Sequence, residues 1–353
     1  MKSWDVIVIG GGIVGLSLSI ELRKKGARVL VVERGEPGRE ASSAAGGMLV
    51  DCLFETPAAL QPLATASASM YPEFVYELET ESGMKVDLRD QGTILFPSAP
   101  HSSHPAFESA ARIPTPVAEF EPALADVDRP AFYLKERSVD PRALVSAALK
   151  AAKRRGVDVS SGEEVTAVDR SDGRVSGVTT KKTSFLAKKV VNCAGAWSGQ
   201  IAPCAFPTRP VKGQMLCLVS ASRRLKHVIR TPEVYVIPRS DGRIIVGTTV
   251  EEAGFDKRTD VDTIQRLHAA AVALVPELRD ARILEGWAGL RPGTPDGLPI
   301  LGGTSTPGYF VATGHFRDGI LLAPITAKVM ADVIMGKNSG YDLSAFSPAR
   351  FSS

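Results

Sequence analysis

The sequence lacks several features, and each absence excludes a class of protein. Its 353 residues contain no uninterrupted apolar run long enough to span a bilayer, so we expect no membrane-spanning helix. Asp5 and a glycine cluster interrupt the apolar start of the chain, which argues against a secretory signal and for a cytoplasmic protein. The net charge is only +3, and no basic cluster is interleaved with aromatic residues, so we expect no nucleic-acid partner.

Cysteine and histidine are also scarce. The four cysteines, Cys52, Cys193, Cys204 and Cys217, form no Cys-x-x-Cys pair, and we expect inert thiols in a reducing compartment. The five histidines show no metal-ligand spacing, so the sequence predicts no metal site. The residues that are abundant, 44% hydrophobic and 23% charged, are typical of a globular protein with a sizeable core.

The start of the chain has the pattern of a strand, a glycine turn and a helix. The apolar run from Val6 to Ile9 is typical of a buried parallel strand, and it leads directly into the turn. The turn matches Gly-x-Gly-x-x-Gly at Gly10, Gly12 and Gly15, which allows a tight turn, a close backbone approach to a pyrophosphate and close helix packing. A helix over residues 13–25 would direct its N-terminal amides at that pyrophosphate.

A carboxylate ends the second strand of this unit. Glu33 lies 18 residues after Gly15, where it can accept hydrogen bonds from the ribose hydroxyls of an adenosine. An ordinary glycine-rich turn would not account for this acid, and an acid disfavours the 2′-phosphate of NADP. The sequence therefore predicts a bound adenine dinucleotide, and FAD-binding chains commonly begin in this way.

Two further segments are rich in small residues. Residues 39–49 suit a backbone that lies close against a flat ligand, although a plain flexible loop is the alternative. Residues 192–198 include Gly195, which permits a second close approach. The remaining pattern predicts helices over residues 60–83, 140–155, 259–274 and 320–335, with strands over 92–96, 157–159, 164–169, 175–180, 185–193, 210–219, 234–238, 244–249, 283–288 and 309–312.

Nucleotide-type segments occur at the start, middle and end of the chain, and antiparallel strand patterns interrupt them twice. We therefore predict an α/β fold with a discontinuous Rossmann-like FAD-binding domain and an inserted antiparallel-sheet substrate domain. The FAD-binding domain is expected to comprise residues 1–83, 136–208 and 287–353, and the substrate domain residues 84–135 and 209–286.

Six segments in this order resemble those of a known family. They are the initial turn with Glu33, residues 42–49, residues 192–198, residues 210–213, the run GWAGLRPGTPDGLPILG and the run ATGHFRDGILLAP. Together they resemble the D-amino-acid oxidase family of FAD enzymes and, within it, the bacterial glycine oxidases. Leu290 and Arg291 stand where the related sarcosine oxidases carry a flavin-linking cysteine, so we infer non-covalent FAD.

The resemblance implies an activity. It implies oxidative deamination of glycine, sarcosine or small D-amino acids by hydride transfer to the flavin, with oxygen as oxidant and hydrogen peroxide as product. It also implies a homo-oligomer, dimer or tetramer, and it suggests a role in thiamine biosynthesis. Two alternatives stay open: a D-amino-acid dehydrogenase that passes electrons to a quinone or other carrier, and a flavin-binding subunit without activity.

Arg291 is the first candidate for substrate binding. It stands among uncharged residues from Trp287 to Gly293, and a guanidinium in so apolar a run needs an anion. A substrate carboxylate fits, and the family places its carboxylate-binding arginine in this motif. The alternative is a structural salt bridge to Glu285 or Asp296.

Three other residues are candidates for the same site. In a strand, Glu233 and Tyr235 share a face, so the phenol could join Arg291 at the carboxylate and the acid could attract the substrate ammonium group. A core tyrosine and a solvated glutamate are the alternatives. Arg317 could add positive potential over the carboxylate or contact the flavin edge, with a pairing to Asp318 or a purely structural role as the alternatives. We expect Tyr235, Arg291 and Arg317 to be catalytic, without a general base.

The amides that open the last predicted helix are expected to face the pyrimidine edge of the flavin. The motifs and the resemblance together imply these cofactor-binding residues: Gly10, Gly12, Ile13, Val14, Gly15, Glu33, Arg34, Ser42, Ser43, Ala45, Gly46, Gly47, Met48, Val165, Ala194, Gly195, Trp197, Arg291, His315, Arg317, Asp318, Gly319, Ile320 and Leu321.

Overall fold

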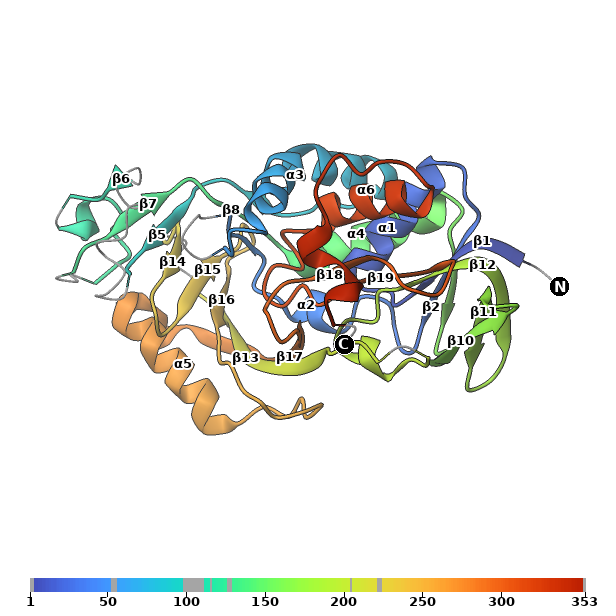
Figure 1. Cartoon of the computed structure of the whole chain (residues 1–353). Helices are drawn as coiled ribbons and strands as arrows, with labels where there is room; N and C mark the ends of the chain where they lie inside the picture. Colours follow the sequence, from blue (N-terminus) through green and yellow to red (C-terminus); the bar gives the residue numbers. More distant parts are fainter. Residues whose placement is uncertain are drawn as a thin grey trace.

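Two large β-sheets and a layer of helices make up the computed structural model, which describes residues 3–51, 56–97, 111–114, 116–125, 129–203, 205–220 and 224–351. Figure 1 shows the helices α1, α3, α4 and α6 gathered over the first sheet, with α5 against the second. The helices are α1 (Ile13–Lys24), α2 (Ala41–Ala44), α3 (Gln61–Ser82), α4 (Pro141–Arg154), α5 (Val261–Leu274) and α6 (Ala323–Ile334).

The first sheet has the strand order β10-β11-β12-β1-β2-β9, and β19 and β18 extend it from β12. Its central strands are parallel, and β10 and β11 form an antiparallel hairpin. The strands are β1 (Ser3–Ile9), β2 (Val29–Glu33), β9 (Asp158–Ser161), β10 (Val165–Ser171), β11 (Arg174–Thr180), β12 (Ser184–Asn192), β18 (Ile300–Gly303) and β19 (Tyr309–Thr313).

The apolar run at the start of the chain is continuous because β1 is buried on both faces. Val6 and Val8 pack with the helices, whereas Ile7 and Ile9 pack on the opposite face. The strand, turn and helix predicted over the first 34 residues are therefore confirmed.

Asp140 precedes α4 and caps it as predicted, since its carboxylate accepts hydrogen bonds from the first amides of the helix.

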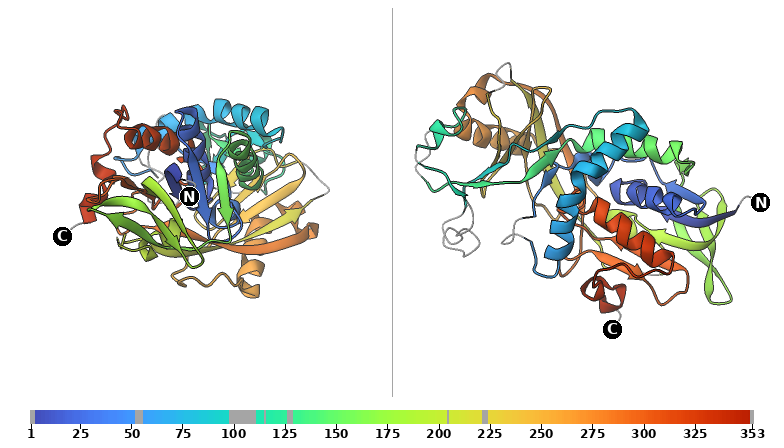
Figure 2. Two further views of the ribbon diagram at one scale, coloured as in Figure 1. Left: turned by 90° about the vertical axis from the view of Figure 1, so that its right-hand side faces the viewer. Right: turned by 90° about the horizontal axis from the view of Figure 1, so that it is seen from above.

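The second sheet has the order β17-β13-β16-β15-β14-β5-β7-β6 and is antiparallel except between β14 and β5. Figure 2 shows it extending away from the N-terminal end of the molecule. Its strands are β5 (Thr93–Leu95), β6 (Ala111–Arg112), β7 (Phe132–Leu134), β13 (Arg209–Val219), β14 (Val228–Arg230), β15 (Tyr235–Pro238), β16 (Arg243–Gly247) and β17 (Arg282–Gly293). A small third sheet joins β3 (Met48–Leu49), β8 (Arg137–Val139) and β4 (Leu88–Arg89).

Three expectations need correction. The strand predicted over residues 283–288 continues to Gly293 because β13 pairs with it along its full length, so residues 287–293 belong to the second sheet. Residues 39–49 contain α2 and β3, so the alternative of a plain flexible loop is wrong. The last helix begins at Ala323 rather than Ile320, with Pro324 in its first turn, so residues 319–322 form a turn before it.

The described helices and cysteines can be compared with what the sequence predicts. Within the described ranges, no helix is both long enough and apolar enough to cross a bilayer. Cys193 and Cys217 are buried and free, and burial raises the pKa of both thiols, whereas Cys52 and Cys204 lie outside the described residues.

Candidate active site

A cavity of about 1030 Å³ is lined by residues of both large sheets. It extends from the turn between β1 and α1, past residues 44–48, to β17 and the turn before α6. Pockets for single small molecules commonly occupy about 300–1000 Å³. The cavity therefore has room for more than an amino acid.

One end of the cavity has the geometry of a dinucleotide turn. Gly10 has φ +103°, and a Cβ there would lie 2.5 Å from the Cys193 carbonyl oxygen. A Cβ on Gly15 would lie 2.1 Å from the Gly10 carbonyl oxygen, so this glycine allows close helix packing. Ser42 reaches the start of α1, where its hydroxyl accepts a 3.0 Å hydrogen bond from the Ile13 amide. Only glycine fits the first and third positions of the motif.

Glu33 is held at the same end of the cavity. Its carboxylate accepts hydrogen bonds from the amides of Gly11 at 2.8 Å and Gly35 at 2.9 Å, and the residue is buried. Beside it, the guanidinium of Arg34 lies 3.5 Å from the ring centre of Trp197. A fixed carboxylate next to the glycine turn has the chemistry that a ribose requires.

The middle of the cavity is shaped by glycine. Gly47 has φ +78°, and a Cβ there would lie 2.0 Å from the Val139 carbonyl oxygen. The carbonyl oxygen of Gly46 accepts a 2.6 Å hydrogen bond from the buried Arg239. The backbone of this segment therefore forms the wall. The elongated cavity, the glycine turn and the held carboxylate together fit an adenine dinucleotide.

Arg291 lies at the other end, inside β17. Its Nη2 donates a 2.8 Å hydrogen bond to the Thr248 hydroxyl, and its Nη1 donates to the Thr249 carbonyl oxygen at 3.2 Å. Gly213 on β13 makes room for it, because a Cβ there would lie 2.4 Å from both Nη atoms. Burial lowers the pKa of Arg291, and the nearby Tyr235 partly offsets this effect.

Neither carboxylate considered as an alternative partner pairs with Arg291. Glu285 forms an ion pair with Arg142, and Asp296 forms one with Arg350 at 2.7 Å. In the described part of the chain, Arg291 has hydroxyl and carbonyl partners but no carboxylate within ion-pair distance. The guanidinium can therefore bind an incoming anion without breaking an ion pair.

A carboxylate lies behind this arginine. Glu251 accepts hydrogen bonds from Thr249 at 2.5 Å and Gln214 at 2.9 Å, and it lies 3.4 Å from the buried Lys212 ammonium. Burial raises the pKa of Glu251, but these hydrogen bonds and the lysine charge outweigh it, so the pKa is lowered. The carbonyl oxygens of Lys212 and Thr249 both accept hydrogen bonds from Arg291. Sequence reasoning missed Thr248, Thr249 and Glu251, which no local pattern distinguishes.

Tyr235 lies at the start of β15 and faces the cavity. A Cβ on Gly46 would lie 3.1 Å from its ring, and one on Gly247 would lie 2.8 Å from it, so the tyrosine ring fills the space between two glycines. Its hydroxyl lies 3.7 Å from the sulfur of Met215. Burial raises the pKa of Tyr235, and the charge of Arg291 offsets part of that rise. The phenol therefore stays protonated at neutral pH and can donate a hydrogen bond.

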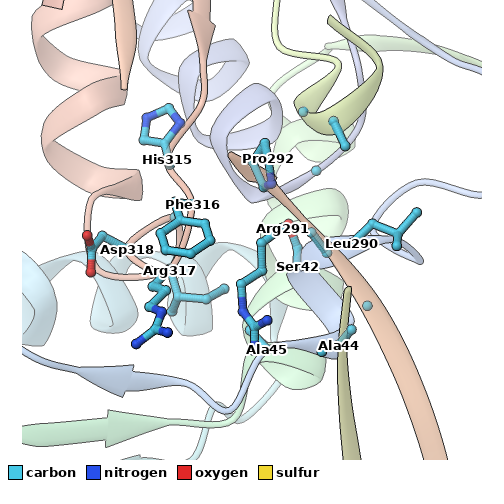
Figure 3. A pocket seen from close by; sticks show the side chains of 18 of the residues that line it. Ser42, Ala44, Ala45, Leu290, Arg291, Pro292, His315, Phe316, Arg317 and Asp318 are labelled. Carbon is cyan, nitrogen blue, oxygen red and sulfur yellow. The ribbon is translucent and has the colours of Figure 1, made fainter. Parts of the chain in front are cut away.

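The other two predicted substrate residues, Arg317 and Glu233, have exposed side chains. Figure 3 shows the guanidinium groups of Arg291 and Arg317 directed to the same side. Arg317 is exposed and lies 5.3 Å from the Phe316 ring centre. Glu233 does not share a strand face with Tyr235, because β15 begins at Tyr235. Its side chain is 63% exposed at the rim, 4.0 Å from Arg129.

Most of the predicted cofactor residues line the cavity. His315 does so, but its ring bonds to Thr326 at 3.1 Å and points away from Arg291 (Figure 3), and burial lowers its pKa to about 4. Gly15, Ser43 and Leu321 are not among the lining residues. The Ser43 hydroxyl donates instead to the Gly38 carbonyl oxygen. The predicted residues that line it are Gly10, Gly12, Ile13, Val14, Glu33, Arg34, Ser42, Ala45, Gly46, Gly47, Met48, Val165, Ala194, Gly195, Trp197, Arg291, His315, Arg317, Asp318, Gly319 and Ile320.

An α/β fold of two large sheets, with a dinucleotide turn at one end of a cavity and a partly buried arginine at the other, fits a flavin-dependent oxidoreductase. Comparison with known proteins agrees. The model of the FAD dependent oxidoreductase family matches residues 5–333, and the chain belongs to this family. The predicted class and the FAD cofactor are therefore confirmed.

The chain is similar to several named relatives. It is 34% identical to the glycine oxidase of Pseudomonas aeruginosa, with 98% of each chain covered. It is 38% identical to the bifunctional protein ThiO/ThiG of Synechocystis over 98% of its own length, and it spans about half of that relative, 54%. The crystal structure of glycine oxidase from Geobacillus kaustophilus matches with a TM-score of 0.95 at 30% identity, covering 99% of each chain.

Proposed function

We propose that this chain catalyses the FAD-dependent oxidation of small amino acids, with glycine, sarcosine and small D-amino acids as substrates. The observation that carries the proposal is the cavity-facing guanidinium of Arg291, whose partners among the described residues are neutral oxygens. A substrate carboxylate would complete its hydrogen bonding. Relatives named glycine oxidase that align over 98% of both chains support this substrate class.

Residues at one end of the cavity would bind FAD, and residues at the other end would bind the substrate. FAD, bound non-covalently, would be held by the turn at Gly10 and Gly12, the carboxylate of Glu33 and the backbone of residues 45–48. Bound FAD would supply the acceptor for a hydride from the substrate Cα, with oxygen as the final oxidant and hydrogen peroxide as the product. Arg291 fixes the substrate carboxylate, and this orients the Cα–H bond.

Tyr235 and Arg317 complete the substrate end. The protonated Tyr235 hydroxyl donates a hydrogen bond to the carboxylate bound by Arg291, and the exposed Arg317 adds positive potential at the entrance. Glu233 at the rim lies where it could attract an ammonium group. No general base is required once the substrate amine has lost its proton, because its lone pair assists departure of the hydride. The imine product is hydrolysed by water to a keto acid and ammonia, or to glyoxylate from glycine.

The cellular location, the oligomeric state and the metabolic role of the protein are also proposals. We infer a cytoplasmic homo-oligomer, dimer or tetramer, that serves thiamine biosynthesis. The free thiols of Cys193 and Cys217 are consistent with a reducing compartment, and the similarity to the ThiO half of bifunctional relatives supports the metabolic role. Light scattering on the FAD-loaded protein measures the oligomeric state, and a single monomeric species would contradict it.

A peroxide-coupled screen of glycine, sarcosine, D-alanine and D-proline tests the activity. We expect peroxide release with at least one of these substrates. Reduction of an artificial dye without oxygen uptake would instead identify a dehydrogenase. If the FAD-loaded protein turned over none of the four substrates by either assay, the proposed function would be wrong.

A further inference from the structure

Helix α3 places two buried hydroxyl groups against the turn that precedes α6. The Tyr71 hydroxyl donates a 2.5 Å hydrogen bond to the Ile320 carbonyl oxygen, and the Ser67 hydroxyl donates a 2.6 Å bond to the Leu321 carbonyl oxygen. All four residues are buried. The two helices pack against each other, and Figure 1 shows α3 beside α6. Residues that are far apart in the sequence are thus joined by two successive hydrogen bonds.

These bonds fix the direction of a backbone amide. In a trans peptide the C=O and the following N–H point to opposite sides. Because the Ile320 carbonyl points at Tyr71, the Leu321 N–H points away from α3. Gly319 and Ile320, directly before it, line the cavity.

The backbone amides of this turn differ in their hydrogen-bond partners. Leu322 donates a 2.8 Å hydrogen bond to the Asp318 carbonyl oxygen. Within the described ranges, neither the Ile320 nor the Leu321 amide donates to a protein group. Buried backbone N–H groups are almost always paired, since an unpaired one is costly. These two amides therefore point to an acceptor supplied by a ligand.

We propose that Tyr71 and Ser67 are positioning residues that hold the Ile320–Leu321 turn with its amides directed at the ring of the bound cofactor, and that they thereby raise its reduction potential. This inference rests on the placement of the flavin ring under the proposed function. Neither hydroxyl touches the reacting atoms. Tyr71 acts through the peptide that carries the Leu321 N–H, and Ser67 supports the turn through the next peptide, whose N–H on Leu322 donates to the Asp318 carbonyl oxygen.

Reduction changes the charge of the flavin ring. Breaking the substrate Cα–H bond as a hydride delivers two electrons and one proton to the ring, so one negative charge remains there. Amide donors near that charge stabilise the reduced form more than the neutral oxidised form. The Tyr71 hydroxyl, which donates to the Ile320 carbonyl, also polarises that peptide and strengthens the bond made by the Leu321 N–H. Burial raises the pKa of Tyr71, so its hydroxyl keeps its proton.

The same helix supplies matched controls. Tyr76 is 70% exposed, and Ser69 is exposed with its hydroxyl bonded to the Ala66 carbonyl oxygen of its own helix. We would prepare the FAD-loaded wild-type protein with the variants Tyr71→Phe and Ser67→Ala, and Tyr76→Phe and Ser69→Ala as controls. Two quantities are measured: the two-electron midpoint potential, by anaerobic equilibration with a reference dye, and the dissociation constant of oxidised FAD.

We expect Tyr71→Phe to weaken reduced FAD relative to oxidised FAD by about tenfold, which lowers the midpoint potential by about 30 mV. Ser67→Ala should shift it in the same direction by a smaller amount, because Ser67 holds the neighbouring peptide, and neither control should shift it. The affinity for oxidised FAD should change by less than about threefold, because a neutral ring gains little from the oriented amide.

Two results would overturn the inference. One is an unchanged potential in Tyr71→Phe, or in Ser67→Ala if the tyrosine variant fails to fold. The other is an equal loss of affinity for both forms of FAD, which would mean that the two hydroxyls only support the structure. Because the potential is measured without substrate, a shift would sustain the inference even if the four-substrate screen were negative.

Discussion

The Nη2 of Arg291 donates a 2.8 Å hydrogen bond to the Thr248 hydroxyl, which joins β17 to the segment that follows β16. This bond fixes the orientation of the guanidinium at the end of the cavity that faces Tyr235. The carboxylate anchor is therefore assembled from two strands, and its parts can be tested separately.

Arg291→Ala should abolish most substrate binding while FAD stays bound. Removing one partner of a desolvated charge pair costs about 2–5 kcal/mol, and every 1.4 kcal/mol is tenfold, so kcat/KM for glycine should fall by at least about 30-fold. Steady-state peroxide assays give kcat/KM, and the flavin absorbance reports the bound cofactor. Arg282→Ala, an exposed arginine on the same strand, is the control and should be neutral. Normal kinetics in the Arg291 variant would reassign the anchor.

Tyr235→Phe should raise KM for glycine by about fivefold, the effect expected from one lost hydrogen bond of about 1 kcal/mol. Because burial raises the pKa of Tyr235, the wild-type phenol should remain a donor up to at least its usual pKa of about 10. A pH profile of kcat/KM in both proteins checks this expectation. An inflection below pH 9 that disappears in the variant would contradict it.

Glu251→Gln should weaken substrate binding at Arg291, because it disturbs the groups that hold the guanidinium. The neutral amide cannot hold the Lys212 ammonium as the carboxylate does, and the carbonyl of Lys212 is one of the acceptors for Arg291. We expect KM for glycine to rise by roughly threefold to tenfold, the range of a charged hydrogen bond that is partly lost. FAD affinity should be unchanged. Glu252→Gln, whose partner Arg209 is exposed, is the matched control, and equal effects in the two variants would contradict the positioning role.

Asp140→Asn tests the stability of the first sheet's helix layer. Burial raises the pKa of Asp140, but Arg239 and Arg243 outweigh this effect and lower it below the usual range. A lowered folded-state pKa means that the carboxylate stabilises the fold above the unfolded-state pKa of about 3.9, and that this contribution is lost as the pH falls below it. Asparagine keeps the helix cap but not the charge.

Urea unfolding should therefore show that the variant is less stable by about 1.5–3 kcal/mol at pH 7, the range for hydrogen bonds to charged groups. The difference should shrink toward pH 3. Asp172→Asn, in the exposed turn between β10 and β11, is the control. A destabilisation that is the same at both pH values would show that the charge of Asp140 contributes nothing.

Local pattern was sufficient for much of the fold. The spacing of Gly10, Gly12, Gly15 and Glu33 identified the dinucleotide turn because the whole motif lies in one short stretch of sequence, although the space at Gly10 is limited by the distant Cys193 carbonyl oxygen. Arg291 was found because an arginine in an apolar run needs an anion. These inferences depend on residues close together in sequence.

Contacts between distant segments could not be predicted. β17 continues through Arg291 because β13 pairs with it, and no residue near position 288 signals that partner. Glu233 was placed on a strand that begins only at Tyr235. Thr248, Glu251 and Tyr71 acquire their roles from partners far away in the chain, so their local sequence gives no signal.

The central claim is that a substrate carboxylate bound at Arg291 delivers its electrons to FAD, and anaerobic reduction tests it most directly. FAD-loaded protein is mixed with glycine in the absence of oxygen, and the flavin absorbance is followed. We predict that the wild-type protein loses its oxidised-flavin absorbance with saturating dependence on glycine, while Arg291→Ala does so only weakly at the same concentrations. Flavin that stays oxidised in the wild-type protein with glycine, sarcosine and D-alanine, or equal reduction in the two proteins, would contradict the account.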